Sequence, residues 1–242
     1  MPPHAAGAGR QMLLPDRLIR GYASFLEGRF VHEQERFRHL AAEGQSPRIM
    51  LIGCCDSRVS PEVIFDARPG ELFIIRNIAN LVPPYGPNDD LHGTSAALEF
   101  GVMALGVDHI VVMGHASCGG IRTFAANEVN SAKAPLSAGD FIGKWISLVA
   151  PAAGKIQSPE KLPFDEYAEQ LGQASVAQSL QHLRSFPWIA ERERVGRLTL
   201  SGAYFGIADG TLLALDEDTG RFETVKVLTQ IQAHVVPERK LV

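Results

Sequence analysis

Two cysteines and one histidine have the residue types and spacing for metal chemistry. Cys54 directly follows the apolar run RIMLIG, while His115 and Cys118 follow the apolar run DHIVVMG. The carboxyl ends of parallel strands meet at one edge of a sheet, where ligands commonly bind. Adjacent strands lie ~4.8 Å apart, and two thiolates on one zinc ion lie ~3.8 Å apart. If the two runs form neighbouring strands, these cysteines can therefore share one metal ion.

Two cysteines and one histidine leave one tetrahedral position free, which is typical of catalytic zinc. The stretch from Cys118 through Gly119 and Gly120 resembles the entry to a helix, whose N-terminus favours a thiolate. The two glycines would also let backbone N–H groups approach a small anionic substrate. A structural zinc site closed by Asp56 is the alternative. We interpret Cys55 as a small buried hydrophobe.

The composition indicates a globular protein without nucleic-acid binding. The 242 residues are 45% hydrophobic and 21% charged, with a formal net charge of −4 and no run of Lys or Arg. Three cysteines do not suit a disulfide framework and favour a reducing compartment. Residues 1–14 lack the apolar core of a secretory signal, and no run approaches the ~20 apolar residues of a membrane span. We expect a cytoplasmic protein with a flexible segment over residues 1–14.

Short apolar runs alternate with helical patterns, which is typical of a parallel sheet with crossover helices. The runs are continuously apolar, so both faces of the sheet should be covered by helices. Strands are predicted at 48–53, 72–76, 108–114, 197–202 and, at the sheet edge, 211–215. Helices are predicted at 16–42, 94–105 and 165–185, the last ended by Pro187. No linker divides the chain, so one α/β domain over residues 1–242 is expected.

The segments that carry these residues resemble the β-class carbonic anhydrases. CCDSRVSPE matches the C-x-D-S-R motif of that family, and GHASCGG matches its G-H-x-x-C-G-G motif. IRNIANLVPPYG resembles the segment between the motifs in plant-type members. The similarity runs from about Leu14 to about Leu215. It implies a Rossmann-like fold with an antiparallel edge strand, one Zn²⁺ per subunit, and reversible hydration of CO₂ to bicarbonate and a proton by zinc-bound hydroxide.

The resemblance also assigns roles to the residues of both motifs. By motif position, the zinc ligands are Cys54, His115 and Cys118, and Asp56 and Arg58 form the Asp-Arg dyad of the family. As a carboxylate, Asp56 would accept a hydrogen bond from the hydroxide and aim its lone pair at carbon. A two-point contact from Arg58 would keep Asp56 ionised and turned away from the metal. The alternative for the dyad is a structural ion pair.

The substrate site implied by the resemblance is mostly apolar, as CO₂ requires. Phe73, Ile78 and Phe100 occupy the positions that line the CO₂ pocket, and Phe100 replaces a tyrosine present in many members. Gln45, nine residues before the first cysteine ligand, and the N–H of Gly119 are the expected donors to the substrate oxygen.

Regulation and assembly are likewise inferred from the family. Some bacterial members bind bicarbonate at a second pocket that uses a tryptophan three residues before the first cysteine ligand. Leu51 stands at that position here, so no such pocket is expected beside Arg76. The resemblance implies dimers or multiples of dimers, with each cleft completed by the partner subunit. The helix at 16–42 would either embrace that partner or pack on its own sheet.

Three other functions remain open from the sequence. A related enzyme on the same scaffold would hydrolyse carbonyl sulfide or carbon disulfide, and would differ in access to the pocket. A binding protein would use zinc structurally and show no hydration activity. A thiol redox protein is disfavoured because no C-x-x-C motif occurs and a disulfide between Cys54 and Cys55 would be strained.

Overall fold

The computed structural model describes residues 14–88, 90–129 and 135–226, which fall into two compact units, 1–45 and 46–242. The predicted flexible segment 1–14 lies outside the described residues except for its last residue. None of the helices in the described ranges is long and apolar enough to cross a lipid bilayer.

The N-terminal unit is a pair of helices, α1 (Asp16–Glu27) and α2 (Arg29–Glu43). Gly28 separates them with a non-helical backbone, so the helix predicted at 16–42 is divided in two. Phe25 packs against Phe30 and Phe37, with ring centroids 5.6 and 5.9 Å apart. These aromatic side chains therefore join α1 to α2 within the unit.

The second unit is an α/β structure whose helices alternate with strands along most of the chain. Its strands are β1 (Ile49–Cys54), β2 (Leu72–Asn77), β3 (His109–His115), β4 (Thr199–Phe205), β5 (Leu212–Asp216) and β6 (Arg221–Thr224). Its α-helices are α3 (Pro61–Ile64), α4 (Gly93–Glu99), α5 (Gly119–Val129), α6 (Phe141–Ile146), α7 (Ala150–Ala153), α8 (Phe164–Arg184) and α9 (Pro187–Arg194). The other helical segments are the 3-10 turns η1 (Ile78–Asn80), η3 (Ser147–Val149) and η4 (Pro159–Lys161) and the π-helical η2 (Phe100–Leu105).

The sheet has the strand order β2-β1-β3-β4-β5-β6. The first four strands are parallel, and β5 and β6 continue the sheet in antiparallel fashion. This confirms the predicted mostly parallel sheet with an antiparallel edge, and β6 adds a strand that was not predicted. Strands β1 and β3 are neighbours, with Gly53 opposite Met113. The chain leaves β1 for β2 on one side and β3 lies on the other, so the carboxyl end of β1 is a topological switch point.

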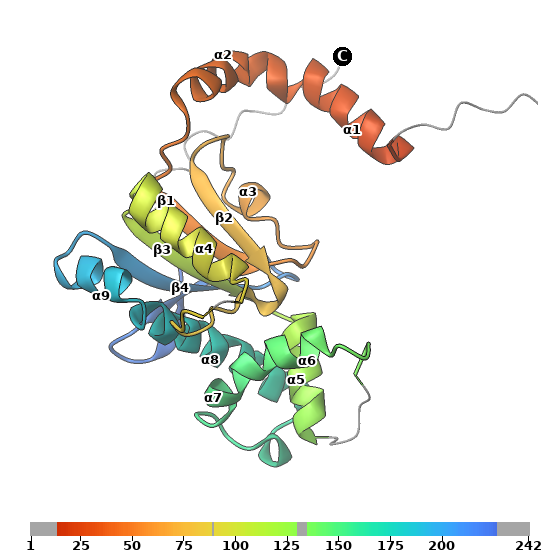
Figure 1. Cartoon of the computed structure of the whole chain (residues 1–242). Coiled ribbons are helices and arrows are strands. Elements are labelled where there is room, and N and C mark those ends of the chain that lie inside the picture. The colour runs from red at the N-terminus through yellow and green to blue at the C-terminus, as the bar shows by residue number, and fades with distance from the viewer. Residues whose placement is uncertain (1–13, 89, 130–134, 227–242) are drawn as a thin grey trace, which may run out of the picture. The chain divides into compact units, whose positions relative to one another are not determined.

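Alternate side chains of the strands point to opposite faces of the sheet. One face, which includes Met50, Ile52 and Ile110, packs with residues of α4, α8 and α9 in the largest apolar core. Figure 1 shows α4 and α8 beside the strands. The other face, with Leu51 and Met113, packs against Ile64 of α3. Helices on both faces hold β1 and β3 in place, and both strands end at the site described next.

Candidate metal and catalytic site

Cys54, His115 and Cys118 lie together at the carboxyl ends of β1 and β3. Cys54 is the last residue of β1, His115 is the last residue of β3, and Cys118 immediately precedes α5. The sulfurs of Cys54 and Cys118 are 3.9 Å apart, and the ligand atoms of the three residues all lie within 4.8 Å of one another. All three side chains are buried. The structure thus brings together the three predicted ligands, at a sulfur separation that suits one tetrahedral ion.

One ring nitrogen of His115 has no hydrogen-bond partner among the described residues. Its Nδ1 lies 2.9 Å from the carbonyl oxygen of Ala116, to which Nδ1–H donates. Its Nε2 is buried without a hydrogen-bond partner. Burial lowers the pKa of His115, but Cys54 and Asp56 outweigh that effect, so the pKa is raised on balance. A fixed Nδ1–H and an unpartnered Nε2 are the arrangement of a metal-binding histidine.

The two buried thiols have pKa values that move in opposite directions. The hydrogen bond with Cys118 lowers the pKa of Cys54 to about 4, and the N–H of Ala79, 3.4 Å from the sulfur, adds to this. The same hydrogen bond, with burial, raises the pKa of Cys118, although the N–H groups of Gly120 and Ile121 partly oppose it. One proton shared by two sulfurs is readily displaced by a divalent cation, because thiolates are the form that binds metal. The donor set therefore fits a zinc ion with one position left for a small ligand.

Asp56 and Arg58 form a two-point ion pair beside these ligands. Nε and Nη2 of Arg58 donate to the two carboxylate oxygens of Asp56 at 2.9 and 2.7 Å, and the backbone N–H of Arg58 adds a 3.0 Å bond. These bonds hold the pKa of Asp56 well below its usual range. Oδ2 of Asp56 lies 4.0 Å from Nε2 of His115. An ionised carboxylate thus faces the metal-binding atoms while both its oxygens remain bonded to Arg58.

Two residues that support the site were not predicted for this role. Ala79 reaches Cys54 through its backbone N–H, and it does so in a left-handed conformation, with φ of 61°. Arg76 donates to carbonyl groups of the segment that carries Asp56. Neither contact has a sequence signal of its own, because almost every residue type has a backbone N–H and an arginine on a strand does not reveal which carbonyl groups it reaches.

Gly119 and Ile78 border the metal-binding cluster. Gly119 is the exposed first residue of α5, and a Cβ added there would meet nothing within 4 Å. Ile78 directly precedes Ala79, and its Cγ2 lies 2.8 Å from where a Cβ on Gly120 would be. These two predicted substrate residues therefore lie next to segments that carry the ligands.

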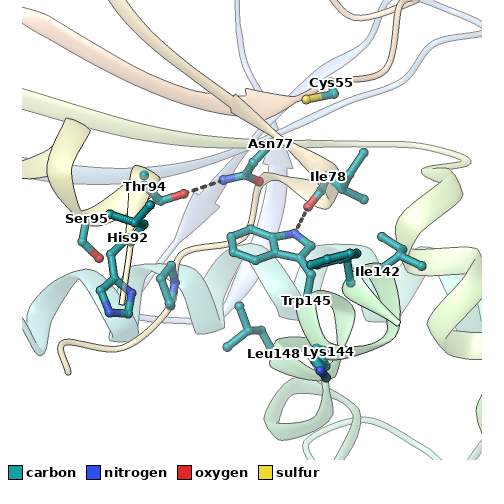
Figure 2. A pocket seen from close by; sticks show the side chains of 14 residues that line it. Cys55, Asn77, Ile78, His92, Thr94, Ser95, Ile142, Lys144, Trp145 and Leu148 are labelled. Carbon is teal, nitrogen blue, oxygen red and sulfur yellow. Dashed lines mark hydrogen bonds between the residues drawn. The ribbon is translucent and has the colours of Figure 1, made fainter. Parts of the chain in front are cut away.

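Ile78 also lines an apolar cavity of about 700 Å³ together with Cys55 and Trp145. Figure 2 shows the indole N–H of Trp145 directed at the carbonyl of Ile78, a hydrogen bond of 2.8 Å. Cys55 is exposed, not buried as predicted; it follows Cys54, the last residue of β1, and lines this cavity. The hydrogen bond from Trp145 attaches the cavity wall to η1, the turn that also contacts Cys54 through the N–H of Ala79.

Phe73 and Phe100 are not brought to the cluster. They contact each other, with ring centroids 6.0 Å apart. Phe73 precedes Asn77, the residue paired with Cys54, by four positions, which is ~13 Å along a strand. Phe73 and Phe100 therefore do not form a pocket with the ligands of their own chain. Gln45 is exposed and is the last residue of the N-terminal unit.

The chain was compared with known protein families, proteins and structures. The family model described as carbonic anhydrase matches residues 49–212. The chain is 36% identical over 199 residues to beta carbonic anhydrase 5, chloroplastic, of Arabidopsis thaliana, which covers 81% of this chain and 63% of that protein's length. The chain thus spans less than two thirds of that relative.

Two solved structures of β-carbonic anhydrases have the same fold as this chain. The structure of the β-carbonic anhydrase CcaA has a TM-score of 0.76 and 31% identity, and the match covers 87% of this chain and 92% of that chain. A structure from a study of two tetrameric β-carbonic anhydrases of Sordaria macrospora has a TM-score of 0.65 and 28% identity, with coverage of 82% and 95%. In both comparisons the match covers most of this chain.

Proposed function

The chain belongs to the β-carbonic anhydrase family, and we propose that it catalyses the reversible hydration of CO₂ to bicarbonate and a proton. The proposal is carried by the buried Cys54, His115 and Cys118 cluster at the ends of two adjacent parallel strands. No observation favours carbonyl sulfide or carbon disulfide as the substrate. A single zinc-binding catalytic domain over residues 1–242 is part of the proposal.

The metal in this proposal is one zinc ion per subunit, held by Cys54, His115 and Cys118. Two thiolates and one imidazole are a donor set that zinc prefers, and the unpartnered Nε2 of His115 supports it. When bound, zinc acts as a Lewis acid that lowers the pKa of a coordinated water. Because the two thiolates neutralise the charge of the ion, protein groups around it must supply part of the activation.

Asp56 is proposed to orient the attacking water. Its carboxylate is ionised at any physiological pH because Arg58 lowers its pKa, so it accepts a hydrogen bond and does not store the released proton. Arg58 fixes the plane of the carboxylate through two parallel bonds. The water lone pair is thereby aimed at the carbon of CO₂, while the N–H of Gly119 is a donor for the oxygen that gains charge.

The apolar part of the substrate site is proposed to be shared between subunits. Ile78 lies beside the ligands of its own chain, whereas Phe73 and Phe100 lie apart from them. Phe100 is 49% exposed, and its side chain is therefore available to another molecule. We propose that Phe73, Phe100 and Gln45 complete the cleft of a partner subunit in a dimer or tetramer.

The tetrameric enzymes of Sordaria macrospora support self-association by similarity. A cytoplasmic location remains a prediction, because one similar protein is chloroplastic.

Stopped-flow measurement of CO₂ hydration across pH, with zinc content determined on the same sample, tests the function. We expect one zinc per subunit and hydration activity that is lost in Cys118→Ser together with most of the zinc. Carbonyl sulfide and carbon disulfide are assayed on the same preparation. A zinc-loaded wild-type protein that is inert toward CO₂ at alkaline pH would overturn the proposal, and hydrolysis of either sulfur compound would identify the alternative activity.

A further inference from the structure

Arg76 holds the segment that connects the metal-binding strand to α3. This segment, residues 55–60, has no helix or strand of its own and carries both Asp56 and Arg58. Arg76 lies on β2 opposite Gly53 of β1, one residue before Cys54. Its Nε donates to the carbonyl of Cys54 at 2.8 Å, and its Nη2 donates to the carbonyls of Asp56 at 2.7 Å and of Val59 at 3.2 Å.

One guanidinium group thus binds the backbone of residues 54–59 at its first, third and last residues. Carbonyl groups in an irregular segment need hydrogen-bond donors, and here a single planar group satisfies three of them. The backbone of β2 reinforces this, because the N–H of Cys55 donates to the carbonyl of Asn77 at 2.9 Å. The backbone of Asp56 is therefore fixed from β2, while Arg58 fixes its carboxylate.

The same geometry argues against Arg76 as an anion ligand. The Nε and Nη2 atoms of Arg76 are already bonded to backbone carbonyls. Leu51 of β1, which stands where the second bicarbonate pocket has a tryptophan, is buried in the core. An anion would have to compete with charge-assisted bonds to three carbonyls. Arg76 is exposed as a whole, yet its Nε and Nη2 face the backbone of residues 54–59.

We propose that Arg76 is a positioning residue that keeps the backbone of residues 54–59 in the conformation that directs Asp56 at the metal site. The catalytic part of this inference rests on the proposed function. The backbone part does not, because the mobility of the segment can be measured without any substrate.

The test compares Arg76→Gln and Arg76→Lys with wild type, and uses Arg194→Gln as a matched control. Arg194 is an exposed arginine of α9 that pairs only with Glu191 among the described residues. We expect Arg76→Gln to retain one zinc per subunit and to lower kcat by about 10- to 100-fold with KM little changed. The kcat of Arg76→Lys should lie between those of wild type and Arg76→Gln, because an ammonium group cannot bind three carbonyls as a planar guanidinium does. Arg194→Gln should behave as wild type.

Two further measurements separate positioning from a general structural effect. Hydrogen exchange of the peptide that covers residues 54–60 should become faster in Arg76→Gln, and remain unchanged in distant peptides such as that of α9. In a double-mutant cycle, Arg76→Gln should lower kcat much less when Asp56 is already asparagine, because Arg76 acts through Asp56.

Unchanged exchange over residues 54–60 in both variants would overturn the proposal, as would equal losses of kcat with and without the Asp56 carboxylate. If Arg76→Gln does not fold, the exchange and kinetics of Arg76→Lys decide the matter. An inert wild-type protein would instead overturn the proposed function, and hydrogen exchange would still test the role of Arg76 in the segment.

Discussion

The carboxylate of Asp56 is largely shielded from solvent and is still charged. It is only 15% exposed, and its bonds with the half-exposed Arg58 lower its pKa and keep it ionised. A group in this state can accept hydrogen bonds but takes up a proton only in strong acid. Its value to the reaction is therefore its direction and charge, not its basicity.

Replacing Asp56 by asparagine keeps the shape of the side chain and removes its charge. We expect Asp56→Asn to lower kcat by about 10²- to 10³-fold, the loss seen when one oriented hydrogen-bonding group is removed from a transition state. Zinc content should stay at one per subunit, because Asp56 is not among the three clustered ligands. Stopped-flow kinetics with metal analysis checks this, and Asp66→Asn, an exposed carboxyl beyond α3, serves as the control. Full activity in Asp56→Asn would show that the dyad is only a structural ion pair.

The sequence was sufficient to locate the residues that carry chemistry, because their types are unusual and lie next to apolar runs. Cys54, His115 and Cys118 were predicted together and are together. Arg76 and Ala79 could not be assigned their roles, because their contacts with the ligand-bearing segment depend on how far β2 extends beside β1. Sequence spacing does not encode that register.

The elements around the site are packed closely enough that small residues are required. A Cβ on Gly114 of β3 would lie 2.8 Å from Cγ2 of Val176 on α8 and 2.9 Å from the ring of Tyr204 on β4. Gly114 immediately precedes the ligand His115. The distance between β3 and α8 is thus set by the absence of a side chain.

Gly114→Ala should destabilise the protein by about 1–3 kcal/mol, the usual cost of overpacking a core. Gly93→Ala is the matched control, because a Cβ at Gly93 would meet nothing within 4 Å and Gly93 begins α4. Urea unfolding of both variants and wild type gives the free energies of unfolding. A Gly114→Ala protein as stable as wild type would show that α8 can move away from β3 at no cost.

A second contact between elements makes stability depend on pH. Burial raises the pKa of Glu169 on α8, while a hydrogen bond from the hydroxyl of Tyr204, at 3.1 Å, opposes that shift only in part. The folded protein therefore holds the proton of Glu169 more tightly than the unfolded chain does. This contribution to stability is complete below the ordinary pKa of 4.5 and is lost as pH rises through the higher folded value.

Glu169→Gln removes this proton linkage without changing the shape of the side chain. The free energy of unfolding of wild type, minus that of Glu169→Gln, should fall as pH rises above about 4.5. Urea unfolding of both proteins at a series of pH values in the same buffers measures this difference, in which pH effects common to both proteins cancel. A difference that rises with pH would mean that the folded protein favours the ionised carboxylate.

Elements were predicted correctly where an apolar run is buried on both faces of the sheet. The prediction was incomplete where one local sequence signal is compatible with two structures. The strand predicted at 108–114 is observed as β3, His109–His115. Pro187 was expected to end a helix, and it does follow the end of α8, but it also occupies the first position of α9, where proline is well tolerated. Strand β6 has only four residues and is mostly exposed, so it has no apolar run to predict it.

Helix α1 carries an apolar stripe that α2 does not cover. Leu18, Tyr22 and Leu26 recur at four-residue steps along α1, Leu14 continues this spacing just before the helix begins, and all four are more than a third exposed. Residues four apart lie on one face of a helix. No residue of α1 is buried. An exposed apolar stripe of this kind is typical of a surface that contacts another part of the chain or another molecule.

Self-association through α1 is testable because Leu18 and Tyr22 can be charged with the loss of only one aromatic contact, that of Tyr22 with Phe25. The contacts of Phe25 with the aromatic rings of α2 do not involve either residue. The double variant Leu18→Asp with Tyr22→Asp should have a lower mass by light scattering than wild type, since two carboxylates would have to be buried at the subunit contact. Ala23→Asp places one carboxylate on an exposed position outside the four-residue repeat, and should keep the mass of wild type. If Phe73, Phe100 and Gln45 do complete the cleft of a partner, the dissociated double variant should also lose CO₂ hydration while retaining zinc, because its ligands all come from one chain. An unchanged mass would show that α1 is not the contact, and a dissociated protein with full activity would show that each chain builds its substrate site alone.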